Sequence, residues 1–162
     1  MILNRQRAVR VSVSRLDRFL ARTQRTLRLP RGALTVCLVT NSEIARWNRA
    51  YRGKNRPTDV LSFPTRPHRP ENKVKRRRHP RARQKDLFSS ASFASSASYL
   101  GDIAIAPAVA RENARRFGRA LDDEMRILIL HGILHLMGYD HETDAGQMDR
   151  RERKLRRALG LA

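Results

Sequence analysis

The sequence predicts a single α+β domain, in which a four-stranded mixed sheet packs against about five helices. Its 162 residues are enough for one domain with a sizeable core, and 40% of them are hydrophobic. Segments with strand-like alternation and segments with helical spacing follow one another in the order βαβαββααα. This order, with three helices at its end, implies a sheet packed against helices.

The first part of the chain contains a strand, a helix and a second strand. Valines alternate with polar residues over 9–14, which predicts a half-buried strand. Apolar residues then follow helical spacing over 16–27. The apolar run over 33–40 predicts a second strand that is well buried.

A short helix and a third strand follow. Asn41 or Ser42 is expected to cap a helix that runs over about 43–50. A loop over 51–58, rich in basic residues, leads into a strand over 59–63, which ends at a proline.

The last strand and three helices occupy the C-terminal part. A strand is predicted over 99–106, and the proline that follows suits the first turn of a helix over 107–117. The next helix begins near residue 121 and is apolar nearly all round over 125–137, so it is expected to be buried. A final helix is predicted over about 144–159.

The charge of the chain is strongly positive. It contains 35 Lys and Arg against 15 Asp and Glu, a net charge of +20. Such an excess is typical of proteins that bind polyanions, most often nucleic acids. No apolar run approaches the length of a membrane span, so no membrane partner is expected. The single cysteine, Cys37, cannot form an intramolecular disulfide, and we therefore expect a reducing cytoplasmic location.

Residues 66–98 interrupt the pattern of strands and helices. Prolines, a serine-rich run and a dense cluster of basic residues make this segment unable to bury enough apolar surface to order itself. We interpret it as a basic, mobile insert between two strands. Two interpretations stay open: it grips RNA, or it is a solvated insertion without a function.

Three histidines suggest a metal site. His131 and His135 are one helical turn apart and project from the same helix face. Gly138 can adopt a positive φ, end the helix and bring His141 back to the same point. Three imidazoles suit a divalent transition metal, and three protein ligands with an open fourth position are the pattern of a catalytic zinc site.

The spacing of these histidines matches the zinc-protease pattern H-E-x-x-H-x-x-G-x-x-H, with one difference. Gly132 stands where such proteases carry the glutamate that acts as the base. Glycine cannot accept a proton from water, so the sequence predicts a zincin-like metal helix without the peptidase base.

Three segments together resemble the YbeY family of bacterial endoribonucleases, which act as rRNA maturation factors. They are Trp47–Pro64, Leu100–Ile105 and His131–His141, and they are similar to that family's motifs in content and order. The resemblance implies an endoribonuclease specific for single strands that binds one zinc ion through the three histidines. It also implies a role in maturing the 3′ end of 16S rRNA and in ribosome quality control, with ribosomal RNA and the small ribosomal subunit as partners.

The resemblance also implies a catalytic arginine at Arg52. A guanidinium matches phosphate geometry and can neutralise the charge that develops during phosphodiester cleavage. From the residues alone, Arg52 has no preference over Arg56. We expect Lys54 and Arg56 to bind the RNA backbone.

Several acidic residues are candidates for supporting roles. Asp140 and Glu142 flank His141 and are expected to orient its ring. Asp59 either caps its loop or supports a metal ligand, and the same two interpretations apply to Ser62 and Asp102.

Two other classes of function stay open. One is a noncatalytic RNA-binding protein of ribosome assembly with a structural metal, which would need Asp140, Glu142 or Asp144 to close the site. The other is a metalloprotease, against which Gly132 argues. The native metal, the cleavage site and the oligomeric state are not predicted.

Overall fold

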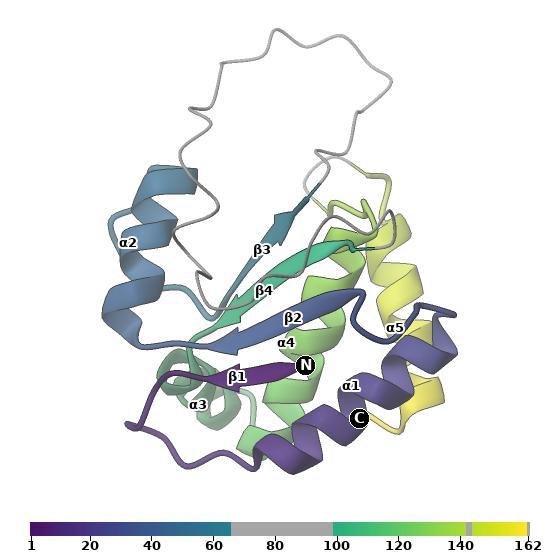
Figure 1. Ribbon diagram of the computed structural model, residues 1–162, viewed down its shortest axis with the longest axis horizontal. Coiled ribbons are helices and arrows are strands. Elements are labelled where there is room, and N and C mark those ends of the chain that lie inside the picture. The colour runs from purple at the N-terminus through teal and green to yellow at the C-terminus, as the bar shows by residue number, and fades with distance from the viewer. Residues whose placement is uncertain (66–98, 142–143, 162) are drawn as a thin grey trace, which may run out of the picture.

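The computed structural model describes residues 1–65, 99–141 and 144–161 (Figure 1). The elements in chain order are β1 Ile2–Asn4, α1 Val13–Thr26, β2 Leu34–Leu38, α2 Asn41–Arg52, β3 Val60–Pro64, β4 Gly101–Ile105, α3 Pro107–Arg116, α4 Leu121–Leu136 and α5 Gln147–Leu159. Within the described residues this is the predicted order, and the α+β class is confirmed. The predicted insert at 66–98 lies outside the described residues.

The four strands of the described chain form one mixed sheet in the order β1-β2-β4-β3. β1, β2 and β4 are parallel, whereas β3 is antiparallel to β4. Val36 in β2 pairs with both Ile2 and Ile103. All five residues of β2 are buried, as expected for a central strand covered on both faces.

Helices cover the two faces of the sheet unequally. The larger core joins α1, α4 and α5 to one face through residues such as Leu16, Leu130 and Leu155. The smaller core lies on the other face, where Trp47 of α2 contacts Phe63 of β3 with the ring centroids 6.1 Å apart. Figure 1 shows α4 passing behind the strands, with α2 and α5 at opposite sides of the molecule.

The predicted strand over 9–14 is wrong. β1 is Ile2–Asn4, and α1 already begins at Val13. The buried side chain of Gln6 bonds both backbone groups of Val9, with Nε2 donating to its carbonyl at 2.9 Å and Oε1 accepting from its N–H at 2.9 Å. These bonds replace a strand ladder, so the alternating valines do not form a strand.

Helix α2 is longer than predicted at both ends. Its cap is Thr40 rather than Asn41 or Ser42, and Thr40 forms a capping box with Glu43. At the other end the helix continues to Arg52, where Gly53 at φ +69° terminates it.

Helix α4 is buried nearly all round, as predicted. Ten of its 16 residues are buried, and acidic residues occupy its first turn. None of the helices in the described ranges is long and apolar enough to cross a membrane.

Candidate metal centre

The three predicted histidines converge. His131 and His135 project from α4, and His141 lies beyond its C-terminal end. The Nε2 atoms of His131 and His135 are 3.1 Å apart, and one nitrogen from each of the three rings lies within 4.8 Å of the others. His131 and His135 are half-buried, and His141 is exposed.

A tight turn after α4 brings His141 to the other two rings. Gly138 adopts φ +93°, a conformation that side-chain-bearing residues rarely take. Its N–H donates to the carbonyl of His135, and the N–H of Tyr139 donates to that of Leu134. The chain therefore reverses within a few residues, and the predicted role of Gly138 is confirmed.

Glu152 of α5 holds the ring of His131, a contact that the sequence analysis did not find. The Nδ1 atom of His131 lies 2.9 Å from Glu152 Oε2, and Arg156 bonds the other carboxylate oxygen. Burial alone would raise the pKa of Glu152, but the contacts with His131 and Arg156 outweigh it and lower the pKa. With Nδ1 bonded to Glu152, Nε2 of His131 is left to face the cluster.

A signal for Glu152 was present in the sequence. The buried positions of α5 are Met148, Glu152, Leu155 and Leu159, so the carboxylate occupies a helical core position. A buried carboxylate needs a specific partner, and this helix face packs against α4.

The pKa of His135 is lowered, first by burial and then by the neighbouring His131 and His141. Asp140 and a hydrogen bond with the backbone of Tyr139 oppose this shift. A lowered pKa favours the neutral imidazole, which is the form that binds a metal.

The donor set fits one divalent transition metal. Two nitrogen ligands of a tetrahedral zinc ion with bonds of about 2.0–2.1 Å are about 3.3 Å apart, close to the 3.1 Å between His131 and His135. In the described part of the chain the cluster contains three imidazoles and no carboxylate. Three imidazoles leave one of the four positions of a tetrahedral zinc ion to another ligand.

Gly132 of α4 packs against β4. A Cβ atom at this position would lie 2.8 Å from Cγ2 of the buried Ile103 on β4. Ser62 Oγ donates to the carbonyl of Gly132 at 3.3 Å. The position faces the packed core, so a glutamate base cannot be accommodated there without separating α4 from β4.

Comparison with known proteins identifies the family. The family model described as endoribonuclease YbeY matches residues 2–160, which is nearly the whole chain. The chain belongs to the YbeY family.

Curated YbeY relatives are similar over most of their length. The endoribonuclease YbeY of Koribacter versatilis is 36% identical over 161 residues, covering 99% of this chain and 86% of the relative. That of Solibacter usitatus is 37% identical over 147 residues, covering 90% and 78%. The solution structure of TM1509 from Thermotoga maritima matches with a TM-score of 0.54 and 25% identity, covering 98% of this chain and 89% of that one.

The three basic candidate residues lie at the C-terminal end of α2 and in the loop that follows it. Arg52 is the last residue of the helix, not a loop residue as predicted, and Lys54 and Arg56 follow it in the loop. All three are exposed. Asn48 Nδ2 donates to the carbonyl of Arg56 at 2.8 Å and holds the loop against α2.

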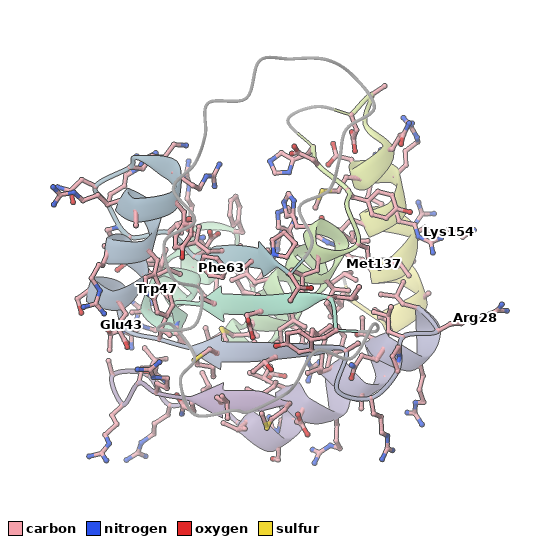
Figure 2. All side chains as sticks on the ribbon, turned by 45° about the horizontal axis from the view of Figure 1, so that its top comes forward. Arg28, Glu43, Trp47, Phe63, Met137 and Lys154 are labelled. Atoms are coloured by element: carbon pink, nitrogen blue, oxygen red, sulfur yellow. The ribbon has the colours of Figure 1, made fainter. Side chains whose placement is uncertain are left out.

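Packing across β3 connects this end of α2 to the metal centre. The ring of Tyr51 lies 5.1 Å from that of Phe63 on β3, and Ser62 on the other face of β3 contacts Gly132, the neighbour of His131. Figure 2 shows Trp47 and Phe63 between α2 and the rest of the sheet.

The acidic candidates close to His141 in the sequence are Asp140, Glu142 and Asp144. Asp140 acts on His135 through its charge, and Glu142 lies outside the described residues. Asp144 accepts bonds from three backbone N–H groups before and within the first turn of α5, which therefore begins at residue 147 rather than 144. Its carboxylate is used for capping and is not part of the cluster.

The remaining candidates have structural roles. Asp59 caps its loop by accepting from the N–H of Val60 and also accepts from Asn113 Nδ2. Asp102 accepts at 2.6 Å from the hydroxyl of Tyr99. Asp102 is on β4 and pairs in register with Phe63, away from the histidine cluster.

Proposed function

We propose that the chain is a metal-dependent endoribonuclease that cleaves single-stranded RNA at a centre formed by His131, His135 and His141. The observation that carries the proposal is the convergence of three imidazoles, with no carboxylate among them in the described residues, in a member of the YbeY family. Zinc suits three nitrogen ligands, although imidazole also binds nickel and copper.

When bound, a divalent metal supplies Lewis-acid chemistry at a phosphoryl oxygen and makes water a nucleophile near neutral pH. The three neutral imidazoles leave the positive charge of such an ion uncompensated. Glu152 keeps a proton on Nδ1 of His131 and so presents Nε2 to the cluster. Gly132 supplies no base for peptide hydrolysis. This favours phosphodiester cleavage, in which neutralising the charge on the phosphate oxygens contributes most of the catalysis.

Arg52 is proposed to bind the scissile phosphate. It is exposed at the end of α2, and α2 packs on β3 next to the helix that carries the histidines. A guanidinium donates two parallel hydrogen bonds to a phosphate, and its charge opposes the negative charge that develops on the oxygens. Lys54 and Arg56 in the following loop are proposed to contact neighbouring phosphates.

The proposed substrate is the 3′ end of 16S rRNA, with a further role in ribosome quality control on the small subunit in the cytoplasm. The net charge of +20 supports a polyanionic partner. Family membership supports an RNA-cleaving activity, since the relatives are named endoribonucleases.

The test combines metal content with single-turnover cleavage of single-stranded RNA. His135→Ala should lose both metal and cleavage, whereas His68→Ala, which changes a histidine that is not one of the three proposed ligands, should keep both. Arg52→Ala should keep fold and metal but cleave about a hundredfold more slowly, a loss of about 3 kcal/mol. Arg52→Lys should recover only part of the rate, because an ammonium lacks the bidentate geometry.

Arg56→Ala is the matched control for Arg52→Ala and should weaken RNA binding without a comparable loss of rate at saturating RNA. Equal rates for wild type and Arg52→Ala would remove Arg52 from the mechanism. Metal-replete wild type that binds RNA without cleaving it would favour the noncatalytic assembly protein. Metal-dependent cleavage of peptides that disappears in His135→Ala would favour a protease.

A further inference from the structure

A second basic site lies apart from the metal centre, where α1, α4 and the C-terminal end of α5 meet. Here a cavity of about 300 Å³ is lined by Arg15, Arg18, Phe19, Arg22, Arg126 and Leu159. Four of these six residues are arginines, and none belongs to the histidine cluster. We call this cavity the arginine pocket.

The positive charge of the arginine pocket comes from α1. Arg15, Arg18 and Arg22 are spaced i, i+3 and i+7, so they lie along one face of the helix. All three are exposed, and within the described ranges no carboxylate forms an ion pair with them. Asp17 lies about 100–160° away from these three arginines around the helix. Like charges at this spacing disfavour the helix slightly, so the stripe is not explained by the stability of α1.

Arg126 forms a fixed wall of the same pocket. It bonds Asp122 and Asp123, which compensate its charge, and its guanidinium lies 5.9 Å from the ring centroid of Phe19. At the C-terminal end of α5, Nη2 of Arg22 donates to the carbonyl of Ala158 at 3.4 Å. Phe19 and Leu159 thus form the apolar part of the pocket, and the guanidinium groups of the arginines supply its hydrogen-bond donors. Such a pocket suits a phosphate, whose oxygens accept several hydrogen bonds.

We propose that the arginine pocket binds a backbone phosphate of the RNA strand, apart from the phosphate that is cleaved. This inference rests on the proposed RNA substrate. Glu152, which supports His131, and Leu159, which lines the pocket, are seven residues apart on α5, about 10 Å along the helix. A separation of this size lies within the length of an RNA strand of several nucleotides.

The chemistry of this surface favours RNA over an anionic membrane. Helices that bind membranes insert exposed apolar side chains between the lipids. Within the described residues the exposed large hydrophobic side chains are Met1 and Phe117, neither of which lines the pocket. The surface offers guanidinium groups in a hollow, which is the pattern of phosphate recognition.

The test measures the affinity of a labelled single-stranded RNA over a range of salt concentrations. The variant carries Arg15→Gln, Arg18→Gln and Arg22→Gln. The control carries Arg111→Gln, Arg115→Gln and Arg116→Gln on α3, which removes the same charge from another helix. The pocket variant should bind at least about tenfold more weakly than the control, with a salt slope lower by about 0.7, because the contact to one phosphate of a single strand is lost. Its metal content and its rate on a short RNA that reaches only the metal centre should be unchanged.

Equal weakening in the two triple variants would show an effect of net charge alone and overturn the inference. If the pocket variant binds RNA as wild type does but no longer binds vesicles containing phosphatidylserine, the surface binds a membrane and the inference is also overturned. If the triple variant does not fold, the single Arg18→Glu serves instead and should weaken RNA binding more than Arg18→Gln. If wild type fails to cleave RNA while the pocket variant still loses affinity, the proposed function fails and the arginine pocket stands.

Discussion

Gly132 lies between the two helical histidines in the sequence, and Ile103 of the sheet limits the size of the residue at this position. Replacing it with alanine places a Cβ atom 2.8 Å from Ile103, which is fully buried. Overpacking of this kind costs about 1–3 kcal/mol, partly offset by the higher helix propensity of alanine, worth about 1 kcal/mol. We therefore expect Gly132→Ala to unfold at a lower urea concentration than wild type.

Ile103→Val provides the control for this clash, because it removes Cδ1, one of the atoms that the new Cβ would meet. In Gly132→Ala combined with Ile103→Val, the loss should be smaller than the sum of the two single losses. Additive losses would show that Cδ1 of Ile103 does not limit the residue at 132.

Glu152 is expected to determine how tightly the metal is held. Glu152→Gln keeps a hydrogen-bonding side chain of the same size but removes the charge beside His131. Loss of such a contact typically weakens metal binding about 10–100-fold. Competition with a chromophoric chelator measures this affinity directly. Glu112→Gln, an exposed change on α3, is the control, and equal affinity in both variants would assign Glu152 to packing alone.

At the scale of elements, the segment between β1 and α1 depends on one side chain. Gln6 is 4% exposed and satisfies both the N–H and the carbonyl of Val9. Gln6→Ala leaves these two backbone groups without their side-chain partner. Because an unsatisfied buried group costs about 1–3 kcal/mol, the free energy of unfolding should fall by at least that amount.

Gln6→Glu is an informative companion to Gln6→Ala. A carboxylate can still accept from the N–H of Val9 but cannot donate to its carbonyl at neutral pH. Its stability at neutral pH should therefore be below that of wild type and should recover in part at low pH, where the carboxyl group is protonated. Wild-type stability for Gln6→Ala would show that the segment does not need these bonds.

At the scale of the whole molecule, metal binding is expected to stabilise the fold. The three histidines come from α4 and the turn beyond it, and Glu152 connects them to α5. Zinc at 100 times its dissociation constant should raise the free energy of unfolding by about 2.7 kcal/mol. Thermal melts with zinc and with a chelator measure the difference. His135→Ala should show no such shift, and an equal shift in that variant would place the stabilising ion elsewhere.

Long-range packing accounts for most of what sequence analysis missed. The order of elements, the burial of α4 and the turn at Gly138 follow from local patterns of hydrophobicity and from glycine geometry. The alternating valines predict a strand over 9–14, and this prediction is wrong. The side chain of Gln6 bonds the backbone N–H and carbonyl of Val9, so these groups do not pair with a neighbouring strand. The sequence predicts a loop at Arg52, whereas α2 continues to this residue, because basic residues near a helix end do not show whether the helix has ended.

By itself the sequence determined the α+β class and the convergence of the three candidate metal ligands, because helical spacing and one glycine turn place those histidines within a segment of eleven residues. Only the tertiary structure decided that Glu152 supports His131, that Gly132 faces Ile103 and that α1 and α4 form the arginine pocket. These contacts join residues on different elements. Their distances depend on how helices pack on the sheet, and no periodicity within a single segment records that packing.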